Sequence, residues 1–200
     1  MSISEKLKCD FSTTLSALGL QPNSSVVIGV SGGTDSMALA SLCANWSIKS
    51  GVKCLAVIID HGLRTESSKQ ACQTQNTLEK LNIQSKIIKI SSTPPDGNIQ
   101  HWARTQRLHL LMSEARKLKG VLMLAHHLDD QLETFYMRLL HNSGLFGLAG
   151  IKFFRIHKDI CIIRPLLNCR KTQLHSYCVE NHIDIIEDPS NQYVKFDRVR

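Results

Sequence analysis

Short apolar runs alternate with longer amphipathic segments over the first 140 residues of the chain. Four of the runs have the length and apolar character of buried strands, and the first of them is rich in β-branched residues: 26–30, 54–60, 86–90 and 121–125. The segments that follow them carry helical spacing, over residues 35–46, 66–81, 98–117 and 128–140. Strands and helices in alternation form parallel sheets with helices on both faces. The pattern therefore predicts an α/β fold built on a doubly wound, mostly parallel sheet.

Beyond residue 142 the pattern changes to a turn-rich stretch punctuated by glycines. It predicts a small extension made of a hairpin and a last helix, formed by residues 152–156, 161–167 and 171–181. The length suits one domain. We therefore expect a single domain over residues 1–200, with an N-terminal segment 1–22 before the sheet and the extension 142–200 after it.

Three polar clusters follow strands of the predicted sheet. They are the loop 31–36, the triplet Asp60-His61-Gly62 and the run 125–130, which contains His126, His127, Asp129 and Asp130. Ligands of open α/β sheets bind at the carboxyl ends of the strands. The three clusters are therefore predicted to converge on one site.

The loop Ser31-Gly32-Gly33-Thr34-Asp35-Ser36 lies between a strand and a helix. Its glycines let the backbone adopt positive φ and approach a ligand closely. Free N–H groups at the start of the following helix, aided by the helix dipole, form a phosphate site. The loop has neither the Gly-Lys-Ser/Thr ending of a Walker loop nor the spacing of a dinucleotide fingerprint. The alternative is an ordinary tight turn between strand and helix.

Two carboxylates, Asp130 and Glu133, are spaced i, i+3 and so share one face of the predicted helix 128–140. At a strand end beside a phosphate loop they could hold Mg²⁺ or the ammonium group of a substrate. The alternative is a solvated helix face. The opposite, apolar stripe is expected to face the core and consists of Leu128, Leu132, Phe135 and Leu139.

Basic and imidazole side chains add further candidates. Arg104 and Arg107 are also spaced i, i+3, and guanidinium groups suit phosphate or developing negative charge; the alternative is again a solvated face. His126 and His127 have no third ligand at a convincing spacing, so a hydrogen-bonded pair is favoured over a metal site.

Composition narrows the partners and the compartment. The net charge of +7 is compatible with a polyanion such as RNA, and equally with a merely basic surface. The seven cysteines include no Cys-x-x-Cys pair, which disfavours zinc-ribbon, iron–sulfur and redox-pair sites and fits a reducing cytoplasm. No apolar segment approaches the length of a membrane span, so we expect no membrane partner. The sequence is compatible with a homodimer.

The loop 31–36 resembles the pyrophosphate loop (Ser-Gly-Gly-x-Asp-Ser) of the ATP pyrophosphatases, which cleave ATP between the α- and β-phosphates. Further motifs resemble one family, the tRNA(Ile)-lysidine synthetases. They are Asp60-His61-Gly62-Leu63-Arg64-x-Glu66-Ser67, Asn98-Ile99-Gln100-x-x-Ala103-Arg104-x-x-Arg107, residues 125–134, Gly144-Leu145-x-Gly147-Leu148-Ala149-Gly150, Arg164-Pro165-Leu166-Leu167 with Arg170, and Glu187-Asp188-Pro189-Ser190-Asn191. The resemblance covers residues 26–200.

The resemblance implies an adenine nucleotide alpha-hydrolase-like fold and ATP-dependent formation of lysidine at the wobble cytidine of tRNA(Ile) with the anticodon CAU. It implies an ATP site of Ser31, Gly32, Gly33, Thr34, Asp35, Ser36, Asp60 and His61, with Asp35 as a ligand of Mg²⁺. It also implies that Asp130 and Glu133 bind free lysine, and that Arg104 stabilises developing charge. Asp35, Arg104, Asp130 and Glu133 are thus the expected catalytic residues.

The sequence differs from the family pattern in two places, and two alternative functions are considered. The family's usual Arg-Asn-Arg-Ile-Arg-like run is Phe196-Asp197-Arg198-Val199-Arg200 here, and the family's C-terminal tRNA-binding domain is absent from these 200 residues. One rival is another pyrophosphate-loop tRNA-modifying enzyme, such as a thiolase, which would use cysteine pairs. The other is a nucleotide-binding module without catalysis, which would not need Arg104, Asp130 and Glu133 together.

Overall fold

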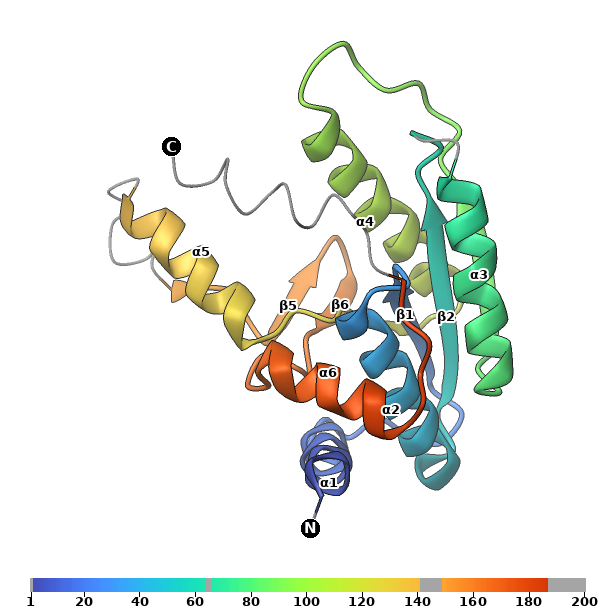
Figure 1. Ribbon diagram of the computed structural model, residues 1–200, viewed down its shortest axis with the longest axis vertical. Coiled ribbons are helices and arrows are strands. Elements are labelled where there is room, and N and C mark those ends of the chain that lie inside the picture. Colours follow the sequence, from blue (N-terminus) through green and yellow to red (C-terminus); the bar gives the residue numbers. More distant parts are fainter. Residues whose placement is uncertain (1, 64–65, 141–148, 187–200) are drawn as a thin grey trace.

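A computed structural model describes residues 2–63, 66–140 and 149–186 of the chain. Its strands form one six-stranded sheet in the order β3-β2-β1-β4-β6-β5 (Figure 1). Their bounds are β1 Ser25–Val30, β2 Lys53–Asp60, β3 Ser85–Lys89, β4 Val121–Met123, β5 Phe154–His157 and β6 Ile160–Ile163. Neighbouring strands are parallel except β5 and β6. The predicted mostly parallel sheet is confirmed.

Helices cover both faces of this sheet. Their bounds are α1 Ile3–Ser16, α2 Thr34–Ser50, α3 Ser67–Lys80, α4 Ile99–Lys117, α5 Leu128–Leu140 and α6 Lys171–Glu180. One buried cluster joins β1 with α1, α2, α3 and α6, and a second joins it with α4. Helices on opposite faces of a parallel sheet make the predicted doubly wound α/β fold.

The central strand β1 shows why this sheet is stable. Val26 and Ile28 point into the first cluster and Val27 into the second, and all three are fully buried. A parallel strand that is buried on both faces needs an almost continuous apolar run. This requirement explains why the run 26–30 was so clear in the sequence.

The β5–β6 hairpin belongs to the main sheet. β6 pairs in parallel with β4, with Leu122 opposite Ile162. The turn residues Lys158 and Asp159 both have positive φ, as a two-residue hairpin turn with the twist of the strands requires. The expectation of a hairpin is confirmed, but it completes the sheet and is not a separate extension.

Helix α1 was not predicted. Ser2 and Glu5 form a capping box, in which each side chain accepts a hydrogen bond from the other residue's backbone N–H. Leu7, Phe11 and Leu15 are buried against the core. The spacing of these three residues by four was present in the sequence, so both the start and the buried face of the helix had a signal.

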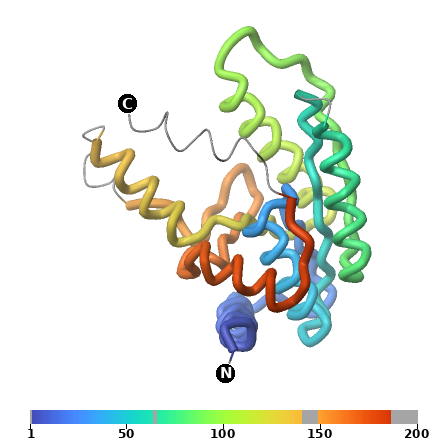
Figure 2. The backbone as a smooth tube through the Cα atoms, in the orientation of Figure 1, coloured from blue at the N-terminus to red at the C-terminus, as the bar shows by residue number. Residues whose placement is uncertain are grey.

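Helix α5 has the predicted bounds, but the predicted burial of its apolar stripe is wrong. Leu132, Phe135 and Leu139 are exposed and Leu128 is only half-buried. The helix extends away from the body of the sheet (Figures 1 and 2), so its stripe meets no core among the described residues. A periodic pattern predicts a helix, but tertiary structure decides which surface the helix meets.

Three smaller points complete the comparison. Helix α4 begins one residue after the predicted start at residue 98; its N-cap residue Asn98 has φ 51°, and the Asn98 side chain makes no capping hydrogen bond. The cysteines are all unpaired, with Cys43 buried and Cys54 and Cys161 packed beside the core. Among the described helices, none combines the length and the apolar character needed to cross a bilayer.

Candidate active site

The loop after β1 has the form of a phosphate site. Gly33 is the N-cap of α2 and offers no side-chain acceptor to the first N–H groups of the helix. The hydroxyl of Ser36 accepts a hydrogen bond from the Ser31 N–H at 3.1 Å and donates one to the Gly33 carbonyl at 3.0 Å. The loop is therefore folded by its own side chains, while the start of the helix stays open to an anion.

Gly32 requires its glycine for two reasons. Its φ is +86°, a conformation that other residues adopt only under strain. A Cβ at this position would lie 2.5 Å from the buried Thr74 hydroxyl and 3.2 Å from Ile186. The backbone of this glycine also accepts a hydrogen bond from the Ile186 N–H at 2.9 Å. The loop is thus packed tightly against α3 and the segment after α6.

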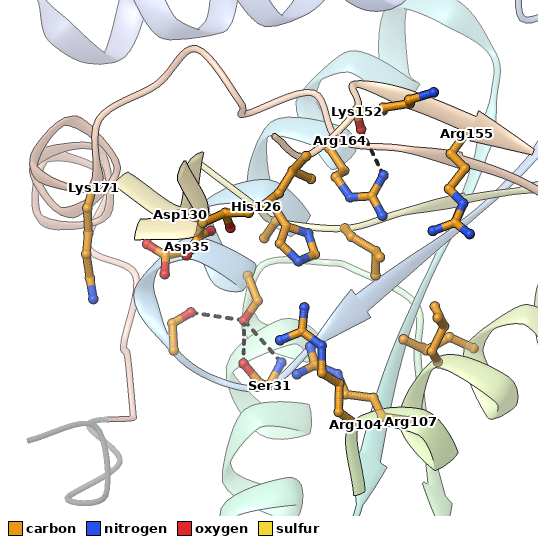
Figure 3. A pocket seen from close by; sticks show the side chains of 18 of the residues that line it. Ser31, Asp35, Arg104, Arg107, His126, Asp130, Lys152, Arg155, Arg164 and Lys171 are labelled. Carbon is orange, nitrogen blue, oxygen red and sulfur yellow. Dashed lines mark hydrogen bonds between the residues drawn. The ribbon is translucent and has the colours of Figure 1, made fainter. Parts of the chain in front are cut away.

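A cavity of about 1460 Å³ opens beside the loop (Figure 3). Seven of the predicted site residues line it: Ser31, Gly33, Thr34, Asp35, Ser36, Arg104 and Asp130. Four do not line it, namely Gly32, Asp60, His61 and Glu133. The volume exceeds the 300–1,000 Å³ or so typical of small-molecule pockets, so the cavity can hold more than a nucleotide.

His127 joins the two carboxylates that line the cavity. Its Nδ1 accepts a hydrogen bond from the Asp130 N–H at 3.3 Å, which leaves the ring proton on Nε2. That nitrogen lies 3.4 Å from Asp35 Oδ2 and 3.7 Å from Asp130 Oδ2. The Asp130 carboxylate also accepts a hydrogen bond from the His127 backbone N–H at 2.9 Å. Of the two histidines predicted to form hydrogen bonds at this strand end, His127 does so. It thereby links α5 to the phosphate loop.

The electrostatics of this group follow from burial and from paired charges. Burial alone would lower the pKa of His127, but the Asp35 hydrogen bond and the charges of Asp130, Asp35 and Asp129 raise it. Burial raises the pKa of Asp130, and the nearby charges of Asp35 and Glu133 act in the same direction against the stabilising contacts from His127. A carboxylate whose pKa is raised by burial and by two neighbouring negative charges favours the arrival of a cation.

Asp129 and Asp130 have different roles although they are adjacent. Asp129 Oδ2 accepts a hydrogen bond from the Lys171 N–H at 2.8 Å, at the first residue of α6. Its carboxylate therefore caps α6, which holds its pKa below the usual value. Asp130 is the one that lines the cavity.

Cationic side chains form the opposite wall of the cavity. Arg104 and Arg107 reach it from α4 and Arg164 from the end of β6 (Figure 3). His126 lies among them, with its Nδ1 buried and lacking a hydrogen-bond partner within the described residues. Burial, followed by the charges of Arg164, Arg104 and Arg107, lowers the pKa of His126 to about 4, so the ring is neutral near pH 7. The wall suits an anion.

Asp60, the first residue of the polar cluster at the end of β2, has a structural role. The buried Asp60 carboxylate accepts hydrogen bonds from the Gly62 N–H at 3.0 Å and from the hydroxyls of Ser67 and Ser68 at 2.6 and 2.5 Å. These contacts and Lys89 overcome the effect of burial and lower the pKa of Asp60. His61 has a buried Nδ1 without a partner in the described part of the chain. Contact of either residue with ATP stays a prediction.

Glu133 lies one turn beyond Asp130 and is exposed. It is close enough for its charge to raise the pKa of Asp130. The shared helix face is therefore confirmed, and a role for Glu133 in lysine binding stays a prediction.

The described residues include no group of three His, Cys, Asp or Glu side chains able to enclose a metal ion. They do fit a Mg²⁺ ion shared with a bound phosphate, because such an ion typically takes only one or two carboxylates and completes its shell with substrate and water. Asp35 Oδ1 is buried without a hydrogen-bond partner in the described structure, beside the phosphate loop. That unpaired oxygen is the donor such an ion would need.

Three cationic residues of this site lacked a local signal in the sequence. Lys152 lines the cavity from the segment before β5, Arg155 from β5 and Arg164 from the residue after β6. They reach it only because β6 pairs with β4, a contact between distant parts of the chain. Arg164 appeared only within the family motif, and the other two carried no motif at all.

Solved structures with this fold include enzymes of different function. The U34-tRNA thiolase NcsA from Methanococcus maripaludis superposes with a TM-score of 0.80 over 94% of this chain and 67% of its own, at 18% identity. An NH3-dependent NAD synthetase from Campylobacter jejuni gives a TM-score of 0.55 over 98% of this chain and 76% of its own, at 20% identity. At these identities the likeness establishes the fold alone.

Sequence comparison is more specific. A relative named tRNA(Ile)-lysidine synthase from Rickettsia bellii is 35% identical over 195 residues, which are 97% of this chain and 44% of that protein. One of the same name from Orientia tsutsugamushi is 36% identical over 181 residues, or 90% and 41%. The chain thus spans less than half the length of these relatives. Residues 4–200 match the family model of the PP-loop domain, and the chain belongs to that family.

Proposed function

We propose that the chain carries the catalytic site of a tRNA(Ile)-lysidine synthase, which uses ATP to join lysine to the wobble cytidine of a CAU-anticodon tRNA(Ile). The observation that supports this most is the convergence of Asp35, His127 and Asp130 between a phosphate loop and an arginine wall. The site thereby offers separate places for a nucleotide, a cation and a polyanion. The relatives' shared name supplies the reaction to which these places correspond.

ATP binds in this proposal with its phosphates on the loop 31–36. The open N–H groups of α2 face the phosphates, and Ser31 and Ser36 hold the loop in shape. Asp35 would hold Mg²⁺, which neutralises the charge of the pyrophosphate when bound. The base carbonyl oxygen of cytidine attacks the α-phosphorus, and pyrophosphate leaves. Arg104, on the opposite wall, stabilises the negative charge that develops at this stage.

Lysine binds on the α5 side of the cavity. Asp130 lines it, and Glu133 lies one turn further along the same helix. The pair binds an ammonium group of the substrate and orients the ε-amine. The amine then attacks C2 of the base and expels AMP with the former carbonyl oxygen. His127 acts as a positioning residue, since it holds both Asp35 and Asp130.

A transfer assay tests this function. The chain is incubated with ATP, Mg²⁺, labelled lysine and a CAU-anticodon tRNA(Ile) transcript, with a transcript of altered wobble base as control. ATP-dependent labelling of the first transcript alone is expected. ATP binding without lysine transfer would favour a nucleotide-binding module, and transfer of sulfur from a sulfur donor would favour a thiolase. Either result would overturn the proposal.

A further inference from the structure

The cationic wall of the cavity is a row of four guanidinium groups. All four line the cavity. The charge of Arg104 lowers the pKa of both Arg107 and Arg164, and the charge of Arg155 also lowers the pKa of Arg164. The four come from two distant places, α4 and the β5–β6 hairpin. In Figure 3 the α4 pair lies beside Ser31, whereas Arg164 and Arg155 lie on the hairpin side of His126.

The row has no compensating charge in the described structure. The carboxylates described there form ion pairs with Lys80, Lys86, Arg116, Lys117 and His127, and none pairs with the four arginines. Arg164 is the most enclosed, being only 9% exposed. One of its terminal N–H groups donates to the Lys152 carbonyl at 2.9 Å, while its Nε is buried without a partner in the described region. Burial and like charges lower its pKa. Such a cluster is costly unless an anion binds it.

The row is longer than the phosphates of one ATP require. The loop and the α4 arginines together surround the place of those phosphates beside β1. The hairpin arginines lie on the far side of β4, towards the sheet edge formed by β6 and β5. Arg155 is exposed there, and Phe154, which is 47% exposed, lines the same cavity. Arginines and exposed aromatic rings that line one cavity are typical of surfaces that bind single-stranded nucleic acid.

We propose that Arg155 and Arg164 bind a backbone phosphate of the RNA substrate beside the target nucleotide, while Arg104 and Arg107 face the phosphates of ATP. The proposal rests on the proposed function and adds to it the side from which the RNA enters, namely the β5–β6 edge of the sheet. Arg164 supplies the enclosed end of the contact and Arg155 the solvent-exposed end. The nucleotide site and the RNA site then meet at His126.

Arg155→Gln tests the proposal, because this side chain is exposed and its loss should not affect folding. Arg116→Gln is the matched control: it removes the same charge from the end of α4, where Arg116 pairs with Asp159 in the turn of the hairpin at 3.2 Å. Binding of a labelled CAU anticodon stem-loop is measured at several salt concentrations, and binding of ATP is measured separately by calorimetry. Arg164→Lys, which keeps the charge but loses the fork of donors, is measured in the same way.

The expected result is a loss of about tenfold in RNA affinity for Arg155→Gln, with a salt dependence shallower by about 0.7 in log–log slope, as for one lost phosphate contact. Arg164→Lys should also weaken RNA binding, and ATP binding should be unchanged in all three variants. Equal RNA affinity in Arg155→Gln and Arg116→Gln would overturn the inference, as would a loss of ATP affinity in Arg155→Gln. If the unaltered chain bound no RNA at any salt concentration, the proposed function itself would fail.

Discussion

The two halves of the cavity differ in how they are built. The phosphate-loop half is a local structure: a buried strand, a tight turn and a helix, contiguous in sequence and tied together by Ser31, Ser36 and Gly33. The other half is assembled from α4, α5 and the β5–β6 hairpin, and it has exposed apolar groups and, in Arg104, Arg107, Arg155 and Arg164, four arginines without an ion pair to any described carboxylate. The comparison indicates that the first half is held together by its own side chains, whereas the second leaves positive charges that a bound anion would neutralise.

Asp35→Ala should have the largest effect, because Asp35 belongs to both halves. It lies in the loop and faces His127 Nε2 at 3.4 Å. Without its carboxylate the charge of the pyrophosphate is not neutralised, and a loss of several kcal/mol of stabilisation should slow RNA-dependent pyrophosphate release by roughly a thousandfold. Asp10→Ala, on the exposed face of α1, is the control. Pyrophosphate release at the unaltered rate would refute the role of Asp35.

Gly32→Ala should disrupt the phosphate-loop half of the cavity and leave the other half unchanged. Positive φ and the close approach of Thr74 together should cost about 2–4 kcal/mol of unfolding free energy and remove ATP binding. Gly19→Ala is the matched control, since Gly19 also has positive φ but nothing lies within 4 Å of its added Cβ. Chemical denaturation and calorimetry measure both effects. Equal costs in the two variants would show that backbone strain alone, and not packing against Thr74, constrains the loop.

Glu133→Ala should affect only the open half. The loss of one charge-assisted contact costs about 1.5–3 kcal/mol, so the Michaelis constant for lysine should rise by roughly one to two orders of magnitude. The constant for ATP should change little, because Glu133 lies outside the phosphate loop. Steady-state kinetics with each substrate varied in turn provide the measurement. A loss of ATP affinity with unchanged lysine kinetics would assign this carboxylate to the metal ion.

The smallest expected effect is the contribution of His126 to the free energy of unfolding, and this contribution depends on pH. Its pKa is lowered from 6.5 to about 4, so the unfolded chain binds more protons between these values and the His126 contribution to stability decreases as pH falls through this window. At about pH 5 the loss should be on the order of 1 kcal/mol. Denaturation of the native chain and of His126→Gln across the window should show a steeper decline in the native chain. Parallel curves would mean that folding leaves the pKa of His126 unchanged.

The same contrast explains what the sequence could predict. The strand 26–30, the loop and helix α2 follow from local rules of burial, turns and capping, and the structure confirms them. The apolar stripe of α5 was assigned to the core wrongly, because helical periodicity does not say whether another element covers the stripe. Arg155 could not be placed at the site, because its position depends on the pairing of β6 with β4. Local interactions are readable from one sequence, but long-range pairing is not.

In the proposed mechanism the two halves meet at a single chemical event, the transfer of the cytidine carbonyl oxygen to AMP. A transcript labelled with ¹⁸O at C2 of the wobble cytidine, reacted with ATP and lysine, tests this directly by mass spectrometry of the AMP released. If the loop half adenylates the base and the open half delivers the amine, the label appears in the AMP phosphate in proportion to the lysidine formed. Lysidine formed with unlabelled AMP would contradict the account.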